Sequence, residues 1–162
     1  MKMLFTAIRG LIYGSLFILT WWWVGNWVRR YDAGIGVILP LWTEAIGIIF
    51  LIFGFILMFS CIGVFILIGK GTPAPLDPPR EFVAVGPYRF VRNPMYIGGW
   101  ITYAGFGLYV QSISIILLAF CWLVLIHFLV IFYEEPVLKK RFGNSYIEYT
   151  NSVKRWIPRL NR

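Results

Sequence analysis

The sequence predicts an all-α integral membrane protein with about four transmembrane helices. Three observations support this fold class. The chain has a mean hydropathy of +0.74 and only 14% charged residues, which is too apolar for a soluble domain of 162 residues. Its apolar residues fall into runs long enough to cross a bilayer, for which a helix needs about twenty residues. Its prolines and charged residues collect between those runs.

The N-terminal part, residues 1–72, is expected to hold two of the helices. The first runs from about Leu4 to Val28. A signal peptide is the rival interpretation, but the apolar run is too long and no small-residue cleavage site follows it. The second helix is expected to begin near Glu44, because Pro40 and Glu44 interrupt an apolar stretch that starts at Ile35.

Small side chains predict how these helices pack. Gly47, Gly54 and Cys61 recur at seven-residue intervals, which places them on one face of the second helix. In the third apolar run Thr102 lies between two further glycines, Gly98 and Gly105, on one face. Such faces favour close helix packing, although the second one could also leave room for a ligand. Cys61 is expected to be a packing residue.

Residues 73–162 complete a single membrane domain. They contain a proline-rich loop, two further apolar runs and a charged tail. The runs extend from about Pro94 to Val110 and from Ser112 to Tyr133, and their short connection predicts an antiparallel hairpin. The tail is expected to form a short cytoplasmic helix and to end in an interfacial anchor around Trp156.

The basic residues predict the orientation. Lys and Arg gather in residues 70–92 and 139–162, and the hairpin turn has none. Both segments, and with four helices both termini, are therefore expected in the cytoplasm. Only Arg29 and Arg30 count against this assignment. The formal charge of +8 suits an anionic membrane surface better than a nucleic acid, because no long basic tract is present.

The segment from Gly86 to Tyr96 is the first candidate site. Asn93 and Pro94 have the form of a helix start, with Asn as the capping acceptor and Pro at the first helical position. A helix N-terminus next to Arg92 favours a carboxylate or phosphate. The alternative is that the arginines only contact lipid phosphates.

A pair of carboxylates, Glu134 and Glu135, follows the fourth apolar run. The pair could bind a ligand cation or hydroxyl groups, or it could be a solvated pair matched to Lys139 and Arg141. His127, the only histidine, lies on roughly the same helix face. It is either a hydrogen-bonded packing residue or a functional group within the membrane.

Tyr88 and Tyr96 add aromatic faces, which attract organic cations and also suit a membrane interface. Tyr88 and Glu135 are expected at a boundary, outside the packed interior. Their substitution should then weaken ligand binding more than stability. No metal site is predicted.

Two blocks of the sequence are similar to a known family. GPYRFVRNPMYIGG at 86–99 and EEPVLKKRFGNSYIEYTNSVKRWIP at 134–158 resemble the membrane methyltransferases that include isoprenylcysteine carboxyl methyltransferases and phosphatidylethanolamine N-methyltransferases. The resemblance covers residues 76–158. Asn93 departs from it, because the family usually has His there. The region before the glutamates, HFLVIFY, also lacks the arginine associated with a prenylcysteine carboxylate.

The resemblance implies an enzyme that binds S-adenosylmethionine on the cytoplasmic side and methylates a lipid or small apolar acceptor. By motif position, the cofactor contacts are Glu81, Phe82, Val83, Tyr88, Arg92, Asn93, Pro94, Met95, Tyr96, Glu134 and Glu135. His127 is the nearest candidate base. The alternatives are an NADPH-dependent enzyme similar to sterol reductases and a non-catalytic membrane subunit. The sequence does not identify the acceptor or the oligomeric state.

Overall fold

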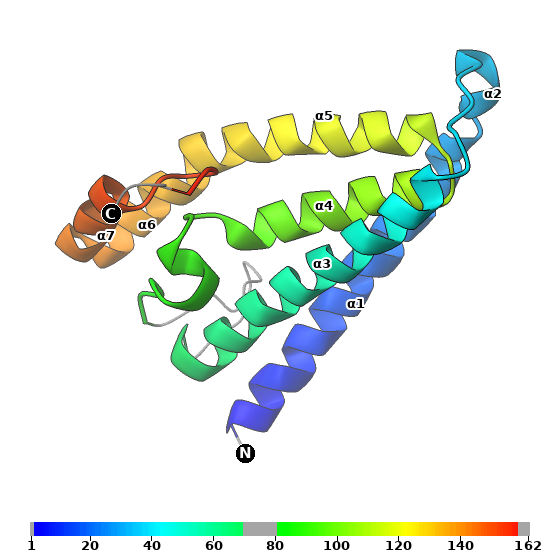
Figure 1. The fold of residues 1–162 in the computed structure, drawn as a ribbon. Coiled ribbons are helices and arrows are strands. Elements are labelled where there is room, and N and C mark those ends of the chain that lie inside the picture. Colours follow the sequence, from blue (N-terminus) through cyan, green and yellow to red (C-terminus); the bar gives the residue numbers. More distant parts are fainter. Residues whose placement is uncertain (1, 70–80, 159–162) are drawn as a thin grey trace.

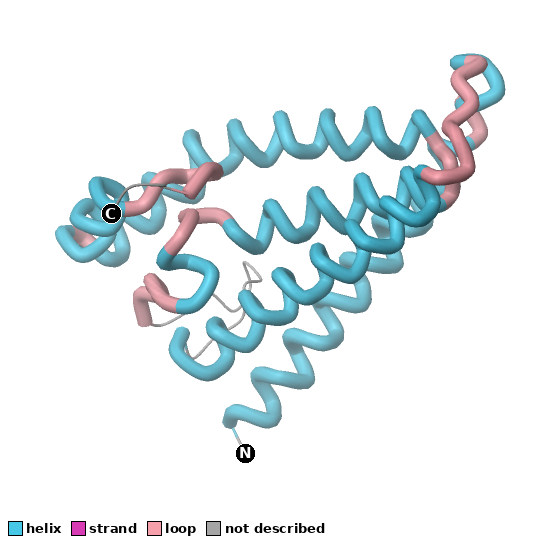
Figure 2. The backbone as a smooth tube through the Cα atoms, viewed as in Figure 1, coloured by secondary structure: helices cyan, strands magenta, loops and turns pink. Residues whose placement is uncertain are grey.

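The computed structural model of the chain describes residues 2–69 and 81–158, and every regular element in those residues is helical (Figure 2). The long helices are α1 (Lys2–Arg29), α3 (Thr43–Val64), α4 (Pro94–Tyr109) and α5 (Ile113–Leu129). The shorter elements are α2 (Asp32–Ile35), η1 (Phe65–Gly69), η2 (Gly86–Arg89), η3 (Val130–Glu134), α6 (Glu135–Phe142) and α7 (Asn144–Ser152).

The four long helices correspond to the four expected from the sequence. The boundaries agree closely, since α3 begins at Thr43 and α4 begins at Pro94. Within the described residues, two helical stretches are long and apolar enough to cross a membrane, Thr43–Gly69 and Ile113–Phe142. The all-helical membrane class is therefore supported, and the number of four spans stays a prediction.

The helices converge at the end of the bundle that carries α2 and spread apart toward the other end (Figure 1). Contacts from the end of α1 and from α2 clamp the hairpin turn. Arg29 donates to the carbonyl oxygen of Val110 at 3.1 Å, and the Asp32 carboxylate accepts from the backbone N–H of Ser114 at 2.8 Å. A cation thus meets the C-terminus of α4 and an anion meets the N-terminus of α5, as the helix dipoles favour.

These contacts change the pKa of the Asp32 carboxylate. Burial pushes its pKa up, but hydrogen bonds from Ser112 and Ser114 and the charge of Arg29 leave the pKa of Asp32 below its ordinary value. The carboxylate is therefore charged at neutral pH. Arg29, which counted against the orientation, has a structural partner here.

The interface between α3 and α4 is built from small residues on both sides. A Cβ atom added at Gly47 would lie 2.7 Å from the carbonyl oxygen of Gly105, and one at Gly54 would lie 2.8 Å from that of Gly98. Real Cβ atoms do not approach a backbone oxygen so closely. Both predicted small-residue faces are confirmed as packing faces, and they meet each other.

At the spread end the chain folds back on itself. α5 continues through the wider turns of η3 into α6, and α7 follows after Gly143, whose positive φ of 57° allows the sharp change of direction. The residues after α7 then return toward η2 and the start of α4 (Figure 1). The candidate site lies where they meet.

Candidate functional site

The Gly86–Tyr96 segment and the glutamate pair are in direct contact. The Tyr96 hydroxyl donates to Oε2 of Glu134 at 3.0 Å. Nη2 of Arg92 lies 3.2 Å from Oε1 of Glu135. Because α4 and α5 are antiparallel, the start of one and the end of the other share one end of the bundle. The predicted meeting of these two segments is confirmed.

Glu135 is the centre of a charge network. The Arg155 guanidinium donates to both of its carboxylate oxygens, from Nε at 2.7 Å and from Nη2 at 2.8 Å. The carboxylate also faces Arg92, and its side chain is only 18% exposed. The hydrogen bonds with Glu135 raise the pKa of Arg155 above its ordinary value. The alternative of a solvated Glu135 matched to the basic residues of α6 is therefore wrong.

Asn93 precedes α4 as expected, with Pro94 at the first helical position. Its amide does not accept a capping hydrogen bond from the helix, however. Nδ2 instead donates to the carbonyl oxygen of Arg155 at 3.3 Å. The prediction that Asn93 is the capping acceptor is wrong, because its buried side chain is used to hold the tail.

The tail from 153 to 158 lies across the loop before α4. The backbone N–H of Arg92 donates to the carbonyl oxygen of Lys154 at 2.9 Å. The Tyr149 hydroxyl donates to the carbonyl oxygen of Tyr88. From the sequence Arg155 counted only toward net basic charge, so its role was missed. The sequence signal that could have revealed this role is the position of Arg155 within the second block that resembles the family, residues 134–158.

His127 is held by the same tail. The Trp156 indole donates from Nε1 to Nδ1 of His127 at 2.9 Å. The histidine is thus hydrogen-bonded to the tail, and its role as a candidate base stays a prediction. With Nδ1 accepting, the ring proton of the neutral form lies on Nε2, so a role as base requires this hydrogen bond to open. The expected interfacial anchor around Trp156 stays a prediction, and the Trp156 indole is directed at His127.

Tyr88 is a core residue. It is only 8% exposed and packs with Cys61 and Val83, with Met95 at the edge of the cluster. Burial, followed by the nearby Cys61, raises the pKa of Tyr88 well above its ordinary value. The expectation that Tyr88 lies outside the packed interior is therefore wrong. Cys61 is confirmed as a packing residue.

The residues at 81 and 82 also join the loop to the rest of the fold. The Glu81 backbone N–H donates to the carbonyl oxygen of Gly69 at 3.3 Å. The Phe82 ring lies edge-on to Tyr149, with 5.2 Å between centroids. Burial raises the pKa of Tyr146, another ring neighbour of Phe82, to about 12, so that phenol stays protonated. The loop and α7 therefore form one packed unit.

Three groups at the site have capacity for a ligand. Among the partners that the structure describes, Glu134 accepts from a single phenol, whereas Glu135 is satisfied by two guanidiniums. The Nε atom of Arg92 is buried without a hydrogen-bond partner among residues 2–69 and 81–158. The Tyr96 ring, 6.3 Å from that of Trp122, adds aromatic faces. A zwitterionic organic ligand that carries a further cation fits this set of groups.

A comparison with protein families agrees with this geometry. The family model described as phospholipid methyltransferase matches residues 42–145. The match covers α3, the hairpin and both glutamates, and it leaves out α1 and the end of the tail. No curated protein matches the chain in a sequence search.

Proposed function

Because the chain belongs to the phospholipid methyltransferase family, we propose that it transfers the methyl group of S-adenosylmethionine to a lipid or small apolar acceptor. The observation that carries the proposal is the meeting of Arg92 and Tyr96 with the two glutamates at one end of the hairpin. The family favours a methyltransferase over the reductase alternative. From the distribution of basic residues, we place the cofactor on the cytoplasmic side.

The residues of the site suit S-adenosylmethionine. Glu134 would accept from its ammonium or ribose hydroxyls, and Arg92 would donate to its carboxylate. The aromatic faces of Tyr96 and Trp122 would suit its sulfonium. The cofactor supplies an electrophilic methyl group, so the protein mainly has to bind, orient and exclude water. Glu135 acts as a positioning residue, because its charge is already shared by two arginines.

Calorimetric titration of the purified protein with S-adenosylhomocysteine, and separately with NADPH, tests the cofactor assignment. We expect binding of S-adenosylhomocysteine only. Glu134→Gln removes one charge-assisted hydrogen bond and should weaken binding by about tenfold or more. Glu148→Gln, on the exposed face of α7, is the matched control and should bind as the wild type does. Binding of NADPH alone would contradict the proposal.

The acceptor needs a separate experiment. Incubation with radiolabelled S-adenosylmethionine and a native lipid extract should yield a labelled apolar product, to be identified by mass spectrometry. A protein that labels nothing and binds neither S-adenosylhomocysteine nor NADPH would support the non-catalytic alternative.

A further inference from the structure

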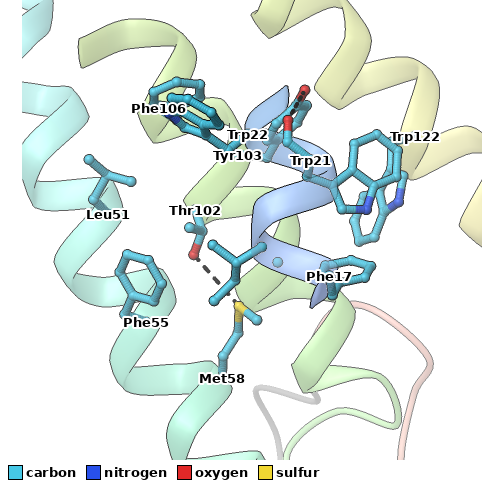
Figure 3. A pocket seen from close by; sticks show the side chains of 12 residues that line it. Phe17, Trp21, Trp22, Leu51, Phe55, Met58, Thr102, Tyr103, Phe106 and Trp122 are labelled. Atoms are coloured by element: carbon cyan, nitrogen blue, oxygen red, sulfur yellow. Dashed lines mark hydrogen bonds between the residues drawn. The ribbon is translucent and has the colours of Figure 1, made fainter. Parts of the chain in front are cut away.

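An apolar cavity of about 180 Å³ lies between α1, α3 and α4 (Figure 3). Trp122 of α5 closes one side of it. The lining residues include Phe17, Ile18 and Trp21 from α1, Leu51 from α3, and Thr102 and Tyr103 from α4. Engineered apolar cavities of comparable size, about 150 Å³, stay dry and bind apolar guests such as benzene.

The two hydroxyl groups that line the cavity, those of Thr102 and Tyr103, already have partners. The Thr102 hydroxyl donates to the carbonyl oxygen of Gly98 at 2.9 Å. The Tyr103 hydroxyl donates to the carbonyl oxygen of Trp21 at 3.2 Å. A polar ligand would therefore lose its hydration without gaining equivalent hydrogen bonds from these hydroxyls. The cavity favours a hydrocarbon group.

One wall of the cavity comes from outside the residues that match the family. α1 lies entirely outside the residues that match the family, 42–145. It approaches the hairpin closely at Gly25, where an added Cβ atom would lie 3.1 Å from the Tyr103 hydroxyl oxygen. Further toward its N-terminus, Phe17 and Ile18 remain 44% and 43% exposed. α1 thus packs tightly against the hairpin beside Gly25, whereas Phe17 and Ile18, which line the cavity, are partly exposed to the surroundings.

The cavity adjoins the candidate cofactor site. Trp122 lines it and also packs edge-on against Tyr96, with 6.3 Å between ring centroids. Tyr96 in turn donates to Glu134. An apolar chain bound in the cavity would therefore contact Trp122, whose ring packs against Tyr96 of the proposed cofactor site.

We propose that α1 completes this cavity as the binding pocket for the apolar chain of the methyl acceptor, an acyl chain that enters from the membrane. The inference rests on the proposed function, because only a methyltransferase has a methyl acceptor. It adds that α1 selects the acceptor by the length and shape of its chain. The continuity from the partly exposed Phe17 and Ile18 through Trp122 to Tyr96 favours this occupant over a free small molecule.

Photolabelling tests the proposal. The full chain is reconstituted in phosphatidylcholine vesicles that contain a phospholipid with a diazirine near the end of one acyl chain. After irradiation, labelled residues are located by mass spectrometry. We expect labels on the cavity residues of α1 and α4. Ile18→Trp and Leu51→Trp fill the cavity from opposite walls and should each reduce these labels by about tenfold.

Matched controls lie one residue further along each helix. Leu19→Trp and Ile52→Trp place the same side chain on exposed positions, at 60% and 56% exposure, and should leave the labels unchanged. Labels confined to outward-facing residues, or equal labelling of filled and control variants, would overturn the proposal.

The cofactor titration separates the two proposals. Binding of S-adenosylhomocysteine without cavity labels overturns the acyl pocket and leaves the proposed function standing. Cavity labels without cofactor binding overturn the proposed function, and with it the assignment of the bound acyl chain to a methyl acceptor. Retained S-adenosylhomocysteine binding in Ile18→Trp also shows that a loss of labels is not a loss of folding.

Discussion

Two adjacent carboxylates have different partners in this protein. Successive helical residues point about 100° apart, so Glu134 and Glu135 cannot face the same neighbour. Glu134 receives the Tyr96 hydroxyl, and Glu135 receives two guanidiniums, one from the loop and one from the tail. This division leaves Glu134 as the carboxylate with capacity for a ligand. It makes Glu135 the residue that holds loop and tail together.

Glu135→Gln tests this role. The substitution keeps the size of the side chain and removes the charge that Arg92 and Arg155 share. We expect amide hydrogen exchange in residues 144–158 to become about tenfold faster, because charge-assisted hydrogen bonds that order this segment are lost. Exchange in α3 and α4 should not change. Hydrogen exchange followed by mass spectrometry, carried out on the wild type and on Glu135→Gln, compares these exchange rates.

The exposed residue Glu148 again gives the control for Glu135. Glu148→Gln lies within the same tail and should leave its exchange rates at wild-type values. Unchanged protection of residues 144–158 in Glu135→Gln would show that the network does not order the tail.

At the scale of elements, the α3–α4 pair is the most closely packed part of the bundle. Two helices whose backbones approach this closely gain van der Waals contact along their whole length, which is the main attraction available to helices in lipid. Both helices contribute small residues at the contact, and each added Cβ atom would meet the backbone of the partner. The position of Tyr96 at the start of α4 depends on this contact.

Gly54→Ala should therefore destabilise the protein by about 1–3 kcal/mol, since the added methyl group overpacks the interface. Gly63→Ala lies in the same helix, where an added Cβ atom has nothing within 4 Å among the described residues. That variant should be neutral or slightly stabilising, because Ala favours helix over Gly. Thermal unfolding in detergent, followed by circular dichroism, compares the two. Equal melting temperatures would contradict the described interface.

At the scale of the whole molecule, the bundle has a narrow end and a spread end with different chemistry. The narrow end holds the clamp of Arg29 and Asp32 on the hairpin turn. The spread end holds the loop, the tail and the charge network (Figure 1). If the long helices cross the membrane, the two ends lie on opposite sides of it.

Substituted-cysteine labelling tests the orientation. In a background with Cys61→Ala and Cys121→Ala, a single cysteine is placed at Ile38, which is 92% exposed at the narrow end, or at Lys139 in α6. A membrane-impermeant maleimide added to intact cells should label Ile38→Cys only, because basic segments stay in the cytoplasm. Lys139→Cys should react after permeabilisation. The reverse pattern would move the cofactor site to the other side.

Much of the helical framework could be predicted because it depends on local pattern. The boundary near Glu44, the start of α4 at Pro94 and the small-residue faces each follow from residue types within one helix. The partners of the polar side chains could not be predicted in the same way. Asn93 was expected to cap its own helix, and its amide instead binds a carbonyl 62 residues further along the chain.

The sequence alone determined the membrane class, the four long helices and the two segments that meet at the candidate site. Each depends on composition or on periodicity within a short stretch, where the bilayer and helix geometry permit few solutions. Only the tertiary structure decided that Tyr88 is buried, that Trp156 binds His127, and that Arg155 pairs with Glu135. These outcomes depend on how the tail packs across the hairpin. Such packing brings together residues that are distant in sequence, and no local pattern records it.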